Sequence, residues 1–287
     1  MTAYREILAA ADADPEAFWR QAADAIDWII PPATTLAKQD DPLPRWFPDG
    51  VANTCYNCVD RHVEGGHGRQ LAIVFESPIT GTRRTLTYQE LQDRVARLAG
   101  ALRARGIGQG DRVLIYMPNS PEAAMAMLAC ARLGAVHSVV FGGFAAPELA
   151  ARIDDAKPKA VIASSCGLEP GRVIPYKPIL EKAFDLAAFP PSHCFVFQRP
   201  EHPADLSSPG DVDALDAMET AAPADCVPVA ATDPLYILYT SGTTGQPKGI
   251  VRDTGGHMVA LAWSMRNLYG SAPGEAFWAA SDVGWVV

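Results

Sequence analysis

The chain has 287 residues, of which 48% are hydrophobic and 20% are charged, and its formal net charge is −9. This composition excludes intrinsic disorder, and the length allows roughly two domains at about 150 residues each. Because the basic residues form no basic stripe, we expect no nucleic acid partner, whereas one anionic small molecule needs only a local positive site.

Residues 1–60 are predicted to form an irregular cap on a larger domain. A short amphipathic helix and a second helix over Pro15–Trp28 come first, and prolines then interrupt the chain as far as Pro48. No basic segment followed by an apolar run opens the chain, and no apolar stretch approaches about 18 residues. We therefore expect a cytoplasmic protein with no membrane partner.

The six cysteines are spread along the chain, and only Cys55 and Cys58 lie close together. They form a single C-x-x-C without a second pair, whereas a structural zinc ion needs about four ligands. We therefore expect reduced cysteines that pack in the interior, and no metal site.

Helices and strands are predicted to alternate from Thr85 onward. Thr87 and Glu90 have the spacing of a capping box, and Gly106 ends the helix that follows. Pro121 and Pro147 open two further helices. The expected strands are residues 112–117, 135–141 and 159–164. This alternation predicts an α/β fold with doubly wound, mostly parallel sheets.

Residues 164–232 are less regular, with a short strand expected at 194–198 and a solvated surface loop or helix over Asp205–Glu219. Beyond them we expect a buried strand at 235–239, a loop, and a helix over 258–268. A last strand is predicted at 275–281. The sequence carries no signal for an oligomeric state.

The loop after the strand at 235–239 is the strongest candidate site, and residues 239–250 read YTSGTTGQPKGI. Glycines let backbone N–H groups converge on one anion, and the hydroxyl groups and a lysine add donors and charge. A flexible linker is the alternative, and Walker A does not fit because Lys248 follows Pro247. The candidate phosphate-binding residues are Thr240, Ser241, Gly242, Thr243, Thr244, Gly245 and Lys248.

The segment YTSGTTGQPKG resembles the phosphate-loop signature of the adenylate-forming superfamily, which comprises acyl-CoA synthetases and adenylation domains. Residues 86–164 resemble the first α/β subdomain of the short-chain acyl-CoA synthetases, and residues 4–28 resemble their N-terminal cap. The resemblance implies that residues 61–287 are the first part of the AMP-binding large domain.

Residues 250–270 and 274–287 are more similar to propionate–CoA ligase than to acetyl-CoA synthetase, because Arg252, Asp253 and His257 replace the "LHTTGGY" pattern of the latter. The resemblance implies a ligase that uses ATP and Mg²⁺ to convert propionate into an acyl-adenylate and then transfers the acyl group to CoA. Acetate is the alternative acid. The hydroxyl groups and Lys248 would hold the β- and γ-phosphates and then pyrophosphate.

The resemblance also implies a CoA site and an acyl pocket. Residues Phe141, Gly142 and Gly143 would pack against the adenine end of CoA, and the segment Glu169, Pro170, Gly171 and Arg172 would hold its 3′-phosphate. Glu169 departs from the family pattern, which often has a second arginine there, so an acidic group would face the phosphate. Trp285, Val286 and Val287 would line the acyl pocket.

The sequence stops within an apolar run, SDVGWVV, so we expect a C-terminally truncated chain. The resemblance places the catalytic lysine, the ribose-binding aspartate and the Mg²⁺ ligands beyond Val287, and hence no catalytic residue and no metal site within residues 1–287. We expect this chain alone to make no acyl-adenylate. A rival hypothesis is a non-catalytic nucleotide- or CoA-binding module.

Overall fold

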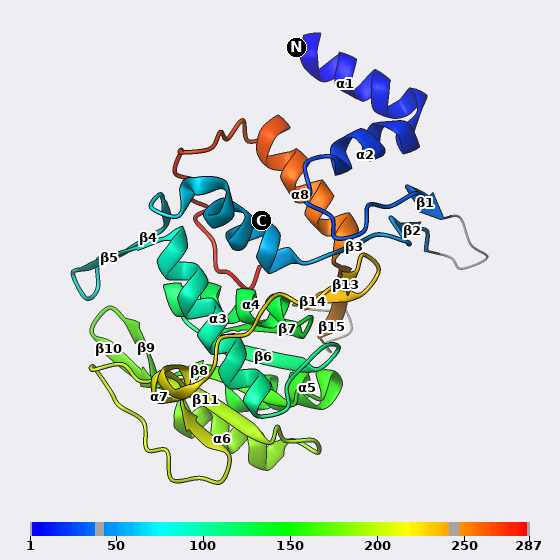
Figure 1. Ribbon diagram of the computed structural model, residues 1–287. Helices are drawn as coiled ribbons and strands as arrows, with labels where there is room; N and C mark the ends of the chain where they lie inside the picture. The colour runs from blue at the N-terminus through cyan, green and yellow to red at the C-terminus, as the bar shows by residue number, and fades with distance from the viewer. Residues whose placement is uncertain (1, 38–42, 241–246, 286–287) are drawn as a thin grey trace.

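The computed structural model describes residues 2–37, 43–240 and 247–285. A seven-stranded sheet lies at its centre in the order β12-β11-β8-β6-β7-β14-β15, and all neighbours are parallel except β14 and β15 (Figure 1). Its strands are β6 (Arg112–Met117), β7 (Val136–Phe141), β8 (Ala160–Ser164), β11 (His193–Phe197), β12 (Asp211–Asp213), β14 (Pro234–Thr240) and β15 (Lys248–Asp253).

Helices cover both faces of this sheet, which confirms the predicted α/β fold. Alternate residues of β6 point to opposite faces, so Val113 and Ile115 join one hydrophobic core and Leu114 and Tyr116 join the other. The first core contains α3 (Tyr88–Ala104), α4 (Pro121–Arg132) and α7 (Ala214–Thr220), and the second contains α5 (Ala146–Ala156) and α6 (Lys177–Leu186).

The predicted helix starts after Thr87 and at Pro121 are confirmed. The Thr87 hydroxyl accepts from the Glu90 N–H at 3.2 Å, and the Glu90 carboxylate accepts from the Thr87 N–H at 2.8 Å. Ser120 caps α4 by accepting from the Ala123 N–H at 3.3 Å. Each cap satisfies backbone N–H groups that have no partner within the helix.

The N-terminal segment contains α1 (Thr2–Ala13) and α2 (Pro15–Ala23), and α1 extends away from the sheet (Figure 1). The prediction that the second helix continues to Trp28 is wrong. The Trp28 indole N–H donates to the carbonyl oxygen of Ala23 at 3.0 Å, which satisfies the end of the helix while the chain turns away.

Short elements connect this segment to the sheet. They are β1 (Leu36–Ala37), β2 (Arg45–Trp46), β3 (Val51–Ala52), the π-helical turns η1 (Tyr56–Asp60) and η2 (Val63–His67), and the hairpin of β4 (Leu71–Ser77) and β5 (Thr82–Thr87). A third hydrophobic core joins Ile26 and Phe47 of the N-terminal segment to Met258 of α8 (Gly255–Asn267). The remaining strands are β9 (Cys166–Glu169), β10 (Arg172–Pro175) and β13 (Val229–Ala230).

Two further expectations need correction. Residues 275–281 form no strand, since Phe277 and Trp278 are 51% and 84% exposed and no described strand lies alongside them. The stretch Asp205–Glu219 is only partly solvated, because α7 buries Ala214, Ala217 and Met218 against the first core.

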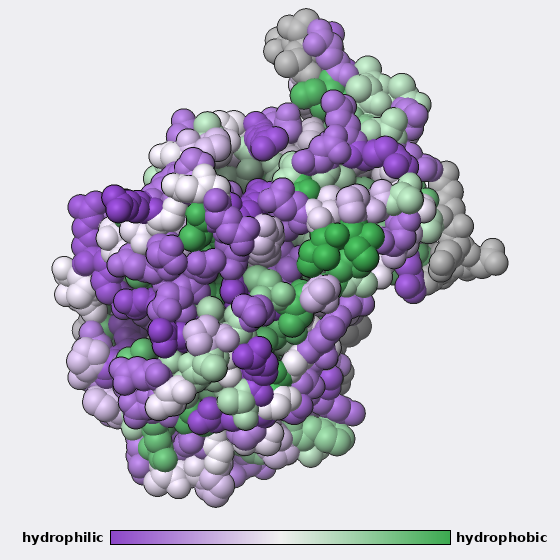
Figure 2. Space-filling view, viewed as in Figure 1, coloured by the Kyte–Doolittle hydropathy of each residue, from purple (hydrophilic) through white to green (hydrophobic). Residues whose placement is uncertain are grey.

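Hydrophilic residues cover most of the face shown in Figure 2, and a hydrophobic patch lies over β3 and β13. Within the described part of the chain, no helix combines the length and the apolar character that crossing a membrane requires.

Candidate functional site

The candidate phosphate loop connects two antiparallel strands. The sequence predicted a strand, a loop and then a helix, but residues 248–253 form β15, which pairs with β14. Thr240 and Lys248 lie opposite each other in this register, so their side chains project from the same face of the sheet. A second strand therefore stands where the sequence predicted a helix, and α8 begins only after β15.

The hairpin lies at the carboxyl end of a parallel pair. Strands β7 and β14 are parallel neighbours, so Phe141 and Thr240, their last residues, share one edge of the sheet. Ligands of open α/β sheets bind at this edge. Lys248 is exposed and forms no ion pair within the described residues, so its charge is available to an anion. The other predicted phosphate-binding residues, Ser241, Gly242, Thr243, Thr244 and Gly245, lie outside the described residues.

Two buried tyrosines that the sequence analysis missed hold the segment after β7. The Tyr116 hydroxyl donates to the carbonyl oxygens of Gly142 at 3.2 Å and Phe144 at 2.9 Å. Burial raises the pKa of Tyr176 to about 12, so its hydroxyl stays neutral near pH 7. The ring centroids of the two tyrosines are 4.5 Å apart, and their phenol groups lie beneath the segment.

Gly142 has no room for a side chain, because a Cβ there would lie 2.2 Å from the Tyr176 hydroxyl oxygen. We therefore expect Gly142→Ala to displace the Tyr176 ring and destabilise the chain by about 1–3 kcal/mol. Denaturant unfolding measures the loss. Gly108→Ala is the matched control, since a Cβ at Gly108 meets nothing within 4 Å. Equal stabilities of the two variants would contradict this packing.

The second predicted CoA segment forms the tip of the β9–β10 hairpin. Glu169 and Arg172 are directly opposite each other, and Pro170 and Gly171 make the turn, with Gly171 at a φ of 72°. All four residues are exposed. At the base of the hairpin, a Cβ on Gly167 would also lie 2.2 Å from the Tyr176 hydroxyl oxygen. Tyr176 thus packs against Gly142 and against the base of the β9–β10 hairpin.

The stretch just before the predicted acyl-pocket segment lies over β7, although the strand expected at residues 275–281 is absent. The Asn119 side chain donates to the Ser281 carbonyl at 3.0 Å and accepts from the Val283 N–H at 3.1 Å. A Cβ on Gly284 would lie 3.4 Å from Val139 Cγ1. Trp285 is 53% exposed, and Val286 and Val287 lie outside the described residues.

Arg252, Asp253 and His257, whose identities favour propionate over acetate as the substrate, lie near a row of three rings. Tyr236 packs between His137, at 5.6 Å between centroids, and His257, at 5.1 Å. His137 and Val139 are two residues apart on β7, so this row shares a face with the segment at Gly284. Asp253 accepts from the His257 N–H at 3.1 Å.

His137 should make the stability of the chain depend on pH. Burial, with a smaller contribution from His257, lowers the pKa of His137 from 6.5 to about 4. The folded state thus binds the proton more weakly than the unfolded state, and the stability contributed above pH 6.5 is lost as the pH falls toward 4. We expect His137→Phe to remove about 2 kcal/mol of the difference in unfolding free energy between pH 7 and pH 5.

Denaturant unfolding of both forms at the two pH values measures that difference. His257 also has its pKa lowered to about 4, by burial and by Arg252, so the variant should keep some pH dependence. An unchanged pH dependence in His137→Phe would contradict the assignment.

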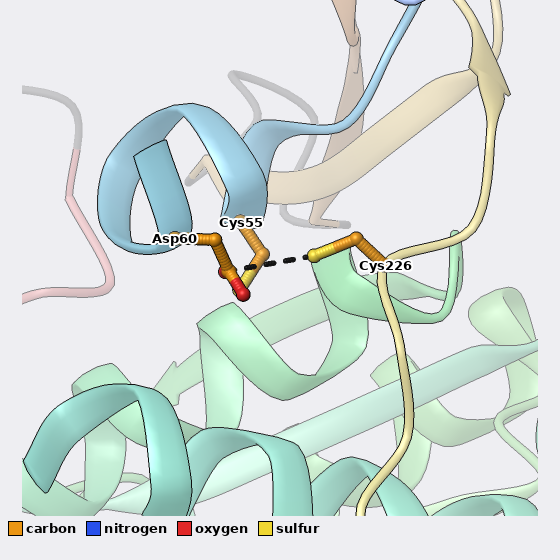
Figure 3. A group of neighbouring side chains, drawn as sticks. All are labelled: Cys55, Asp60 and Cys226. Carbon is orange, nitrogen blue, oxygen red and sulfur yellow. Dashed lines mark hydrogen bonds between the residues drawn. The ribbon is translucent and has the colours of Figure 1, made fainter. Parts of the chain in front are cut away.

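One group of possible metal ligands lies away from this edge, among the described residues. Atoms of Cys55, Asp60 and Cys226 lie within 4.8 Å of one another, and both thiols donate to Asp60 Oδ2 (Figure 3). Cys226 comes from a distant segment, whereas Cys58, the expected neighbour in the C-x-x-C, is exposed. The contact with Cys226, together with burial, raises the pKa of the Cys55 thiol well above its usual value.

The Arg132 guanidinium fills the place of a cation in this group. Arg132 Nη1 lies 2.7 Å from Asp60 Oδ2 and 3.6 Å from Cys55 Sγ, and the two charged side chains are only 6% and 7% exposed. Gln92 donates to the other Asp60 oxygen at 2.8 Å. We therefore interpret the group as a buried ion pair that fastens the N-terminal segment to α3, α4 and the stretch around Cys226.

Comparisons with known proteins show which proteins this chain is similar to. The acyl-CoA synthetase short-chain family member 3, mitochondrial, of Homo sapiens is 50% identical over 99% of this chain and 42% of its own length. The propionate–CoA ligase of Escherichia coli is 45% identical over 96% of this chain and 44% of the ligase. The acetoacetyl-CoA synthetase from Streptomyces lividans superposes with a TM-score of 0.84 at 25% identity, over 95% of this chain and 42% of that enzyme.

This chain spans less than half the length of these relatives. The profile of the acetyl-coenzyme A synthetase N-terminus matches residues 4–58, and the profile of AMP-binding enzymes matches residues 59–287. The chain therefore belongs to the AMP-binding enzyme family and carries the acetyl-coenzyme A synthetase N-terminus ahead of the AMP-binding region.

Proposed function

We propose that this chain supplies the ATP-phosphate and CoA contacts of a short-chain acyl-CoA synthetase that forms propionyl-CoA through an acyl-adenylate. The observation that carries the proposal is the β14–β15 hairpin, which brings Thr240 and Lys248 together at the carboxyl end of the sheet. The propionate–CoA ligase of Escherichia coli, 45% identical to this chain, supports the choice of acid.

The chemistry asked of the hairpin is electrostatic. A carboxylate attacks the α-phosphorus of ATP only if the negative charge on the leaving pyrophosphate is stabilised. The Thr240 hydroxyl and the Lys248 ammonium group lie at the facing ends of β14 and β15. The ammonium group only donates hydrogen bonds, whereas the hydroxyl both donates and accepts them. In this proposal Mg²⁺ accompanies ATP and neutralises further phosphate charge, and none of residues 1–287 is assigned as its ligand.

The CoA contacts belong to the second half-reaction. Phe141 is 46% exposed at the end of β7, where an adenine ring could pack on it, and Arg172 is exposed on the β9–β10 hairpin. Glu169 stands opposite Arg172, so the tip carries both charges and attracts a phosphate less strongly than Arg172 alone would. Phe141 and Arg172 thus have the chemistry for the two ends of one nucleotide.

A comparison of acids tests the proposal. We expect kcat/KM of the complete enzyme to be higher for propionate than for acetate or butyrate, by about tenfold or more, because one methylene in an apolar pocket discriminates by about 1–3 kcal/mol. A preference for acetate would instead support an acetate–CoA ligase. Binding of ATP and CoA without thioester formation from any of the three acids would support a non-catalytic binding module.

A further inference from the structure

Arg152, on α5, is a buried arginine that contacts aromatic rings. It is 7% exposed, and its guanidinium carbon lies 4.4 Å from the ring centre of Phe144 and 5.6 Å from that of Tyr239. Its Nη1 donates to the Glu148 carbonyl at 2.7 Å, and within the described residues it forms no ion pair. The guanidinium is therefore held between π-faces, where a desolvated cation is attracted most strongly.

The two rings are directly adjacent in sequence to the two separate ligand segments of the proposed function. Phe144 follows Gly142 and Gly143 directly, and Tyr239 immediately precedes Thr240 at the hairpin. The Tyr239 hydroxyl also donates to Asp155 Oδ2 at 2.6 Å, three residues after Arg152 on the same helix. Helix α5 thus contacts the β14–β15 hairpin through Tyr239, and it contacts the end of the first CoA segment through Phe144.

We propose that Arg152 is a positioning residue that holds the ATP-phosphate hairpin and the CoA segment in one fixed arrangement. The expected effect on substrate binding rests on the proposed function, whereas the contact between the two segments rests on the ring distances alone. This role depends on the broad, planar guanidinium, whose central carbon lies within 5.6 Å of both ring centres, whereas a lysine ammonium is a compact point charge. A change at Arg152 should therefore affect both segments together.

Steady-state kinetics of the complete enzyme test the consequence. We expect Arg152→Lys to raise KM for ATP and KM for CoA together, each by about fivefold to thirtyfold, with a smaller change in kcat. Arg105→Lys is the matched control, because Arg105 also donates to the carbonyl four residues earlier and lies over one ring, Phe195, outside the site. A rise in only one KM, or the same rises in the control, would overturn the proposal.

Amide hydrogen exchange on the 287-residue chain tests the geometry without any activity. We expect Arg152→Lys to speed exchange by about fivefold or more at Phe144 and along β14 and β15, because both segments open more often. Tyr239→Phe keeps the ring but loses the bond to Asp155, so it should speed exchange only in the hairpin.

Unchanged exchange at Phe144 or in the hairpin would overturn the positioning role. Faster exchange in both segments would support the contact between them, whether or not the enzyme is active. Absence of any reaction of the complete enzyme with ATP and CoA would overturn the proposed function alone. The two failures are therefore distinguishable.

Discussion

Asp60→Asn should destabilise the chain by about 3–5 kcal/mol. Asp60 Oδ2 lies 2.7 Å from Arg132 Nη1, and both side chains are almost fully buried. The substitution removes the carboxylate charge and leaves the guanidinium in a low-dielectric interior without its counter-ion, which costs far more than losing a surface pair. Denaturant unfolding of both forms at pH 7 measures the loss.

Asp93→Asn is the matched control for that experiment. Asp93 pairs with Arg97 at 3.0 Å on the exposed side of α3, where the side chains are 52% and 39% exposed. The same chemical change there should alter the unfolding free energy by less than about 1 kcal/mol, because water screens the pair. A loss in Asp60→Asn no larger than in this control would show that the buried pair does not fasten the N-terminal segment.

Lys248→Ala should reduce adenylation by roughly a hundredfold in the complete enzyme. A lysine about 4 Å from a phosphate oxygen contributes about 4 kcal/mol at an effective dielectric constant near 20, before desolvation is subtracted. The hairpin holds Lys248 opposite Thr240 at the proposed phosphate site, so the loss should fall on the first half-reaction. Propionate-dependent exchange of pyrophosphate into ATP measures it.

CoA affinity distinguishes this role from general damage. It should change little in Lys248→Ala, because the CoA contacts are assigned to other strands. Lys182→Ala, at an exposed lysine on α6, should leave both quantities unchanged. Normal pyrophosphate exchange together with a lost thioester step in Lys248→Ala would contradict the assignment of the hairpin to the phosphates.

The regular part of the fold could be predicted because its signals are local. The capping box at Thr87 and Glu90 and the serine cap at Ser120 set the helix starts through contacts within one turn. The continuous apolar strand at 112–117 requires burial on both faces, which in an α/β chain means the middle of a parallel sheet. These elements lie where the sequence predicted them.

The wrong predictions concern segments whose structure depends on a neighbouring strand from elsewhere in the chain. The local sequence does not indicate whether such a strand is present. Residues 248–253 contain Ile250 and Val251, which favour a strand, but the local sequence does not indicate a partner, and β15 forms because the edge of β14 offers it hydrogen bonds. Residues 275–281 have an apolar pattern but no adjacent strand among the described residues, so they remain irregular. The hairpin of β4 and β5 was missed altogether, although Val74 and Phe75 are residues that favour strands.

The candidate site was predictable only in part. The candidate phosphate loop and CoA segments are predicted from short motifs, but the residues that hold these segments in the structure come from elsewhere in the chain. Tyr116 and Tyr176 have the composition of ordinary core residues, and only the structure shows them against Gly142. Cys226 meets Asp60 across 166 positions, a separation at which spacing carries no information.

Pyrophosphate exchange by the unmodified complete enzyme tests the proposed function most directly. Labelled pyrophosphate should enter ATP only when propionate is present, and it should do so without CoA, because the acyl-adenylate forms before the thiol reacts. Absence of exchange with propionate, acetate and butyrate alike, under conditions where ATP binds, would contradict the proposal that this chain serves an adenylate-forming ligase.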